Sequence, residues 1–356
     1  MSSEIDYPSE YDNSGRVPDA ETLLDAYIDN AAKFREREGL IADYNLAYGS
    51  GERNQMDIFW PNETREAPLV MFIHGGYWKS MDRSAFSHMA SGLLEHGIAV
   101  AMPSYTLCPD IEINGIINEM RRACLVLYQT YKRKITTIGH SAGGHLSACM
   151  MATDWEDIHP DLPNDLVASG MGISGIYDLL PILHTPVNDA VRMNVDQATA
   201  ASPVDWVPEA IQKFEAWVGG DESDEYHRQS RELSQRWSLL GTPTDYITVN
   251  NANHFTIIDA LTDRESLMVH AVLELVETPE AKVKLPRLVK KKVLAEMQTF
   301  EMPPAEGEPS KPTKVKSNKT PPKKKTKPKL TTERKTAAAS RKKPRKKRER
   351  ASTSAN

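Results

Sequence analysis

The pentapeptide GHSAG at residues 139–143 holds the side chain best suited to nucleophilic chemistry. It follows the apolar run Ile135–Ile138 and precedes the helical stretch Gly144–Ala152, which is the strand, turn and helix context of a GxSxG nucleophile elbow. Small neighbours let the turn expose the serine hydroxyl, and the start of the helix offers N–H groups to a developing negative charge. We predict that Ser141 is a nucleophile rather than part of an ordinary glycine-rich turn.

A second glycine-containing turn, HGGYW at residues 74–78, follows the apolar run Leu69–Ile73. Two consecutive glycines let the backbone turn its N–H groups toward a cavity, where they could form an oxyanion hole together with the elbow. A plain strand-exit turn is the alternative, and the presence of the elbow favours the oxyanion hole. The expected donors are the backbone N–H groups of Gly75, Gly76, Tyr77 and Ala142.

A serine nucleophile needs a base, and His254 is the best placed of the ten histidines. It lies in the polar stretch NNANHF, residues 250–255, directly after the apolar run Tyr246–Val249. A histidine in a loop after a late strand can reach over the elbow. His140 is expected to point away from the serine and His145 to pack in the core. The other histidines are interpreted as structural or surface residues.

The acid that should orient the base follows the apolar run Phe214–Val218, in the stretch GGDES at residues 219–223. Asp221 and Glu222 are adjacent, so only one of them can face His254. A Gly-x-x-acid spacing counted from residue 219 favours Glu222, with Asp221 in reserve. Either carboxylate would hold the imidazole and stabilise its protonated form.

No cofactor or metal is expected. The GxGxxG match at residues 170–175 begins inside an apolar run and is soon followed by Pro181, so it does not fit a dinucleotide site. The sequence has no HExxH, P-loop or calcium-loop pattern. The three cysteines, Cys108, Cys124 and Cys149, show no CxxC spacing and suggest neither a zinc site nor a disulfide framework.

Short apolar runs alternating with longer helical patterns must position these residues. Near-continuous Val, Ile and Leu runs separated by helices are typical of a parallel sheet covered on both faces. We therefore predict an α/β fold with a mostly parallel, doubly wound sheet, preceded by a polar stretch over residues 1–20 and a helix over Ala20–Arg37. The predicted strands are Met56–Trp60, Leu69–Ile73, Ile98–Met102, Ile135–Ile138, Met171–Ile173, Phe214–Val218 and Tyr246–Val249.

Charge divides the chain into two unlike parts. Residues 311–356 hold 19 Lys and Arg and two acidic residues, whereas residues 1–310 hold 25 Lys and Arg and 47 Asp and Glu. The formal charges are therefore +17 and −22, although the total is only −5. After Phe300 there is no aromatic residue, and Pro, Lys, Arg, Ser and Thr dominate. Such a segment cannot bury enough apolar surface to offset the entropy of ordering it.

This composition predicts three parts: a catalytic domain over residues 1–280, a peripheral helix within 281–300, and a disordered Lys/Arg/Pro-rich tail over 301–356. Dense positive charge without aromatics favours phosphate attraction over base stacking. Residues 311–356 could therefore bind nucleic acid or an anionic surface, act as a nuclear import signal, or only keep the protein in solution.

The N-terminus is acidic and lacks the apolar core of a secretory signal. The longest apolar runs are far too short for a membrane span. We expect a cytoplasmic protein that acts on a small molecule, and a homodimer is left open.

At this point the sequence resembles the kynurenine formamidase (arylformamidase) branch of the α/β-hydrolase superfamily. The resemblance covers roughly residues 5–277. The blocks that carry it are HGGYW at 74–78, PSYTLCP at 103–109, GHSAGGHL at 139–146, SGIYDL at 174–179, GDESDEYHRQS at 220–230 and NHF at 253–255.

The resemblance implies an α/β-hydrolase fold, Ser141 as nucleophile, His254 as base and a carboxylate at Glu222. It also implies hydrolysis of an aryl formamide, N-formyl-L-kynurenine, to kynurenine and formate. A carboxylesterase or amidase of the same fold with another substrate is the alternative. Tyr77 and Trp78, beside the oxyanion turn, could stack on an aryl substrate or simply pack under the elbow. The tail inherits nothing from the resemblance.

Overall fold

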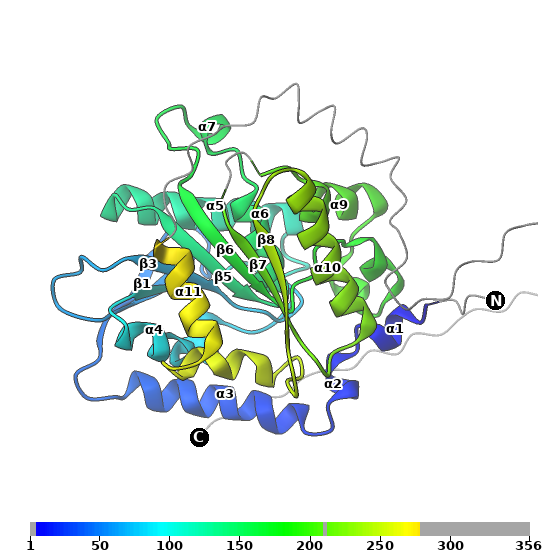
Figure 1. Ribbon diagram of the computed structural model, residues 1–356, viewed down its shortest axis with the longest axis horizontal. Helices are drawn as coiled ribbons and strands as arrows, with labels where there is room; N and C mark the ends of the chain where they lie inside the picture. Colours follow the sequence, from blue (N-terminus) through cyan, green and yellow to red (C-terminus); the bar gives the residue numbers. More distant parts are fainter. Residues whose placement is uncertain (1–4, 209–211, 278–356) are drawn as a thin grey trace, which may run out of the picture. The chain divides into compact units, whose positions relative to one another are not determined.

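The computed structural model describes residues 5–208 and 212–277, which fold around one eight-stranded sheet (Figure 1). The strand order is β1-β2-β4-β3-β5-β6-β7-β8. The first two pairings, β1 with β2 and β2 with β4, are antiparallel, and all the others are parallel. The strands are β1 (Ile41–Ala47), β2 (Gln55–Trp60), β3 (Leu69–Ile73), β4 (Ala99–Pro103), β5 (Ile135–His140), β6 (Val167–Ile173), β7 (Phe214–Gly219) and β8 (Thr244–Val249).

Seven of these strands match the predicted apolar runs, and the mostly parallel sheet is confirmed. Strand β1 was not predicted from the sequence. It is an edge strand, half-buried or exposed along its length, and it holds Asp43, Tyr44 and Asn45. Its pairing with β2 shifts register between Asp43 and Leu46, and Asn45 adopts a positive φ of 57°. A bulged, half-exposed edge strand lacks the apolar pattern that identifies a buried one.

Helices cover both faces of the sheet, so the doubly wound arrangement is confirmed (Figure 1). On one face α5, α6 and α10 contribute to a core that also holds Tyr105 and Trp78. On the other, α3, α4 and α11 pack over Phe72 and Met171. The helices are α1 (Tyr7–Glu10), α2 (Asn13–Arg16), α3 (Ala20–Arg35), α4 (Ser91–Glu95), α5 (Ile113–Tyr131), α6 (Ala142–Met151), α7 (Trp155–Ile158), α8 (Val187–Val191), α9 (Val195–Ala200), α10 (Asp224–Leu239) and α11 (Leu267–Glu277), with short 3₁₀ helices η1 (Arg83–Ala90), η2 (Leu180–His184), η3 (Pro203–Asp205) and η4 (Thr256–Thr262).

Parallel registry brings the carboxyl ends of the central strands to one edge of the sheet. Ile73 at the end of β3 pairs with Gly139 of β5, and Gly219 at the end of β7 pairs with Val249 of β8. In open α/β sheets this edge is where ligands bind. The loops that carry the candidate catalytic residues therefore converge there.

The polar stretch before α3 is ordered from residue 5 and forms two short helices. Asp6 accepts a hydrogen bond from the backbone N–H of Ser9 and caps α1, and Asp12 accepts one from Gly15 and caps α2. These caps compensate for N–H groups that a four-residue helix cannot satisfy itself. Residues 5–17, called the N-terminal segment below, thus have a defined structure that their polar composition did not predict.

Other sequence-based predictions can be located only in part. The candidate helix within 281–300 and the tail over 301–356 lie outside the described residues. Within the described ranges, no helix is long and apolar enough to cross a membrane. The three cysteines are buried and free.

Candidate active site

Ser141 occupies a strained turn between β5 and α6. Its φ of 56° and ψ of −119° lie in a region that non-glycine residues rarely adopt. The turn is held from both sides, because the Ser141 N–H donates to the Ile173 carbonyl at 2.8 Å and its own carbonyl accepts from the His145 N–H at 3.1 Å. Ser141 is 2% exposed. The chain therefore maintains at this serine the sharp strand-to-helix turn that the sequence predicted.

Glycine packs the elbow against the end of β3. A β-carbon at Gly143 would lie 1.9 Å from the carbonyl oxygen of Ile73, so only a hydrogen can fit between the two backbones. A β-carbon at Gly75 would lie 3.1 Å from the β-carbon of Ser141 and 2.9 Å from the His140 carbonyl oxygen. The two turns thus touch through their backbones, and Gly75 borders the serine directly.

Three consecutive residues of the HGGYW turn have positive φ angles: Gly76 at 106°, Tyr77 at 48° and Trp78 at 56°. The N–H groups of Gly76 and Tyr77 donate no hydrogen bond to another described residue. The N–H of Ala142, the first residue of α6, lacks an intrahelical acceptor because of its position. His74 stacks on Tyr105 with ring centroids 4.3 Å apart, and burial lowers its pKa to about 4, so it supports the turn as a neutral ring.

His254 and Glu222 form a closely bonded pair. Nδ1 of His254 lies 2.7 Å from Oε2 of Glu222. The other carboxylate oxygen accepts from the Ser174 hydroxyl at 2.5 Å and from the Gly219 N–H at 2.7 Å. Since an ionised carboxylate can only accept, Nδ1 of His254 carries the proton and Nε2 is left to accept one. Asp221, the reserve candidate, is exposed, and no side-chain bond joins it to His254 among the described contacts.

The loop of His254 is fixed by its neighbours. The Asn253 side chain accepts from the N–H groups of Phe255 and Thr256, at 2.9 and 3.0 Å, and forms a turn before η4. Nε2 of His140 donates to the His254 carbonyl at 2.8 Å, and the two rings lie 4.7 Å apart. Burial and the nearby His254 lower the pKa of His140 well below its usual value, so it stays neutral.

The two aromatic residues predicted for the substrate pocket, Tyr77 and Trp78, lie in different places. Trp78 does not line the cavity, contrary to the expectation that it could stack on a substrate. Its side chain is fully buried, and its indole N–H donates to Nδ1 of His145 at 3.2 Å, beside Cys149 in the core. The positive φ of Trp78 turns it inward, under the elbow. Tyr77 does line the cavity.

Several site residues were missed by the sequence-based analysis. Tyr226, in the first turn of α10, packs its ring 4.7 Å from that of His254. Asn13 of the N-terminal segment donates to the hydroxyls of Tyr226 and Tyr77, at 2.8 and 3.1 Å. The GDESDEYHRQS block at residues 220–230 carried the family resemblance, but no role was predicted for the Tyr226 within it.

A cavity of about 740 Å³ opens at this edge of the sheet. Ser141 and His254 line it together with Gly75, Gly76 and Tyr77, whereas Ala142 and Glu222 lie behind its wall. The opposite wall belongs to the N-terminal segment. That wall consists of Asp6, Pro8, Ser9, Tyr11, Asp12, Asn13 and Ser14. The rest of the lining comes from the largely apolar side chains of Leu24, Tyr27, Met81, Phe86, Val187 and Phe255 and from Lys79, Ser80, His140, Thr185 and Pro186.

Comparison with known proteins identifies relatives of this chain. The BD-FAE family profile matches residues 56–236. The kynurenine formamidase of Danio rerio is 28% identical over 269 residues, covering 72% of this chain and 90% of the relative, and that of Salmo salar is 31% identical over 242 residues, covering 65% and 81%. A solved structure of a candidate thioesterase from Silicibacter sp. TM1040 superposes with a TM-score of 0.69 at 34% identity, over 76% of this chain and all of that one.

The expected α/β-hydrolase fold is therefore confirmed, and the protein is an enzyme of the hydrolase class, of the arylformamidase and esterase type. The similarity to the formamidases is longer than the stretch that the profile matches, because it spans 269 and 242 residues. The chain belongs to the BD-FAE family and to the kynurenine formamidase branch of the α/β hydrolases.

Proposed function

We propose that this enzyme hydrolyses an aryl formamide, N-formyl-L-kynurenine, to kynurenine and formate through a formyl-enzyme intermediate on Ser141. The observation that carries the proposal is the bonded pair of Glu222 and His254, at 2.7 Å, whose imidazole lines the same cavity as the elbow serine. The kynurenine formamidases among its relatives support the choice of substrate.

In this mechanism Ser141 attacks the formyl carbon while Nε2 of His254 takes the hydroxyl proton. Glu222 keeps the second imidazole proton on Nδ1 and offsets the charge of the imidazolium. The oxyanion is held by the N–H groups of the 75–77 turn and of Ala142. His254 then protonates the aryl amine nitrogen, the C–N bond breaks, and kynurenine leaves.

The second half of the reaction repeats the same steps with water. His254 takes a proton from the water molecule, whose oxygen attacks the formyl carbon on Ser141. The ester bond breaks, formate leaves, and the serine regains its proton from His254. No redox step or further cofactor is needed in this scheme.

The cavity suits an aromatic leaving group. Its volume of about 740 Å³ lies in the range of small-molecule sites, and Phe86, Phe255 and Leu24 give it an apolar side. An aryl amine also leaves more readily than an alkyl amine. Trp78 is left out of the proposed pocket because its indole is buried elsewhere.

The second candidate is a carboxylesterase or amidase of the same fold. Steady-state rates on N-formylkynurenine and on short p-nitrophenyl esters, each with a Ser141→Ala control, separate the two. Turnover of the formamide that is lost in the Ser141→Ala variant supports the proposal. Brisk ester turnover without any formamide turnover would refute the formamide as substrate, and undiminished activity of the variant would refute the serine mechanism.

The basic tail suggests a separate activity, since residues 311–356 carry a formal charge of +17. We infer that this tail binds polyanions such as duplex DNA through phosphate contacts, with steep salt dependence. Affinity for a short duplex at 50 and 200 mM salt, compared between the full chain and residues 1–310, tests this. Equal affinities for the two chains would rule out a tail role in that binding.

A further inference from the structure

The N-terminal segment reaches the reacting groups through two tyrosines. Asn13 of this segment donates to both Tyr77 and Tyr226, at 3.1 and 2.8 Å, and the two hydroxyls lie 2.8 Å apart. Tyr226 lies on α10, far in sequence from Asn13 on α2. Its ring packs against that of His254, with ring centroids 4.7 Å apart. Tyr226 is fully buried, and Asn13 is 8% exposed. The base is thus one side chain away from the segment.

The direction of these hydrogen bonds follows from counting protons. The Tyr77 hydroxyl donates its single proton to the Tyr11 carbonyl oxygen at 2.7 Å, because a carbonyl cannot donate. Tyr77 can therefore only accept from Tyr226, which spends its own proton in that bond. The oxygen of Tyr226 is left as an acceptor for Asn13. A chain of oriented hydroxyls thus ends on the backbone of the N-terminal segment.

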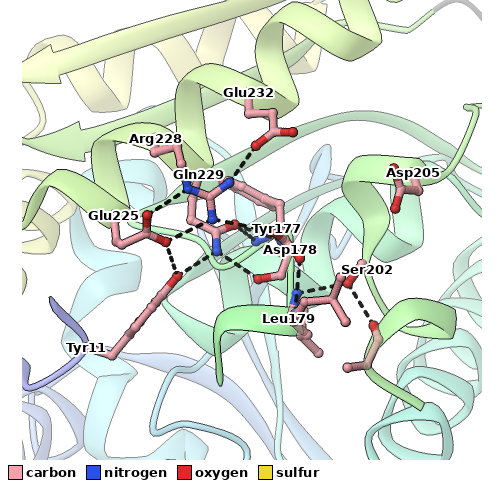
Figure 2. A network of polar contacts seen from close by, with 12 residues as sticks. Tyr11, Tyr177, Asp178, Leu179, Ser202, Asp205, Glu225, Arg228, Gln229 and Glu232 are labelled. Carbon is pink, nitrogen blue, oxygen red and sulfur yellow. Dashed lines mark hydrogen bonds and ion pairs between the residues drawn. The ribbon is translucent and has the colours of Figure 1, made fainter. Parts of the chain in front are cut away.

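The segment itself is anchored by a buried polar network, seen in Figure 2. The Tyr11 hydroxyl donates to Glu225 at 2.8 Å and accepts from Nε2 of Gln229 at 2.8 Å. Arg228 binds both oxygens of Glu225, at 2.8 and 2.9 Å. Oε1 of Gln229 accepts the N–H groups of residues 177 and 178, at 2.8 and 2.7 Å. Every bond of this anchor is made to α10 or to the loop after β6.

From these contacts we propose that the N-terminal segment is a positioning element of the active site. Asn13 and the Tyr11 carbonyl fix the hydroxyls of Tyr77 and Tyr226, and Tyr226 in turn holds the His254 ring in the reactive arrangement. Tyr226 and Asn13 are positioning residues. Their effect rests on the proposed serine mechanism but on neither choice of substrate.

The test compares Asn13→Leu, Tyr226→Phe and the double variant in the full chain. Tyr226→Phe keeps the aromatic ring and Asn13→Leu keeps a branched side chain, while each change removes hydrogen bonds, so kcat should fall roughly tenfold with KM changed less than about threefold. The double variant should be no slower than the slower single one, because both changes break one unit. Tyr7→Phe is the matched control, since Tyr7 lies on the same segment but outside the cavity lining and its hydroxyl has no hydrogen bond to a described residue.

Two substrates and one covalent probe make every outcome decisive. The rates are measured on N-formylkynurenine, on a p-nitrophenyl ester and for labelling of Ser141 by a fluorophosphonate, all well below the melting temperature of each variant. Unchanged kcat, a rise in KM alone, or losses that multiply in the double variant would overturn the positioning role. Ester turnover without formamide turnover would overturn only the proposed substrate, because the ester still reports the variants. A protein that Ser141-directed probes never label would overturn the serine mechanism and this inference together.

Discussion

Two walls of one cavity are built in different ways. The strand-end loops that carry Ser141 and His254 are fixed by positive φ angles and by backbones in contact at Gly143. The N-terminal segment is fixed by side chains, and Tyr11 and its partner Glu225 are separated by 214 residues. The wall formed by the strand-end loops, called the loop wall below, therefore tolerates almost no added atom. The wall formed by the N-terminal segment, called the segment wall, can lose its hydrogen bonds one at a time. The first wall should fail abruptly on substitution and the second gradually.

The largest expected effect is on the loop wall, at Glu222. Glu222→Gln replaces the carboxylate by a neutral amide that neither offsets the imidazolium nor fixes the Nδ1 proton of His254, so kcat should fall by roughly 10³–10⁴-fold. Asp221→Asn, the matched control on the adjacent exposed acid, should stay within about twofold of the parent. Equal losses in the two variants, measured by steady-state kinetics, would remove the distinction between these acids.

Next in size is a change at the contact between the two turns. Gly143→Ala would place a β-carbon 1.9 Å from the Ile73 carbonyl oxygen, and both atoms belong to rigid backbone. The free energy of unfolding in urea should drop by about 3–5 kcal/mol. For comparison, Gly115→Ala in α5 meets only the flexible side chain of Ile111, at 2.4 Å, and should change stability by less than about 1 kcal/mol. A small loss of unfolding free energy in Gly143→Ala would show that the backbone of the loop wall can shift to accept an added atom.

A smaller effect is expected from the segment's anchor. Tyr11→Phe removes the hydroxyl that bridges Glu225 and Gln229, while Glu225 keeps its bonds to Arg228. Unfolding free energy should fall by about 2 kcal/mol, and limited proteolysis should cut the N-terminal segment faster than in the parent. If Tyr11→Phe lost as much unfolding free energy as Gly143→Ala, both walls would be equally sensitive to substitution. The distinction drawn between them would then be wrong.

The smallest effect concerns a residue outside the cavity lining, His88 of η1, whose ring packs beside that of Tyr27 with centroids 6.0 Å apart. Burial lowers the pKa of His88 to about 4, and neither ring nitrogen has a partner among the described residues. The unfolded chain takes up a proton below pH 6.5 while the folded one does not, so stability is lost as pH falls from about 6.5 toward 4.

Replacing His88 by Phe should therefore reduce the difference in unfolding free energy between pH 7 and pH 6 by about 0.7 kcal/mol. The buried His74 and His145, whose pKa values are also lowered to about 4, keep part of the pH dependence in that variant. Urea titrations at the two pH values measure this. An unchanged pH dependence would show that His88 is protonated in the folded protein.

The catalytic residues of the loop wall could be predicted from the sequence because the constraints on them act over only a few residues. Glycines lie two residues before and two residues after Ser141, and an acid lies three residues after Gly219. Both spacings are visible in the sequence. The apolar runs likewise predicted seven strands, since burial on both faces requires them. Strand β1 escaped because half-exposed edge positions accept polar residues.

The segment wall was not predictable for the opposite reason. Asn13 and Tyr11 look like ordinary residues of a polar stretch, and their partners on α10 are more than 200 residues away. The two alternatives for Trp78, stacking on a substrate or packing under the elbow, could not be separated for a similar reason. The sequence shows that an aromatic residue follows the glycine pair, but not that its backbone, with φ of 56°, directs the side chain into the core. Tertiary contacts and backbone angles decide such cases.

His140 occupies the first variable position of the GxSxG pattern, yet its ring donates to the His254 carbonyl at 2.8 Å and links the nucleophile's strand to the base's loop. A mutational library that randomises this position should therefore recover few active clones, and a substitution there would be read as a defect of the histidine loop rather than of the serine. In directed evolution of this enzyme for new substrates, diversity is better placed at Val187 and Ser9, which line the cavity and whose side chains make no hydrogen bond or ring contact to Ser141, His254 or Glu222 among the described residues.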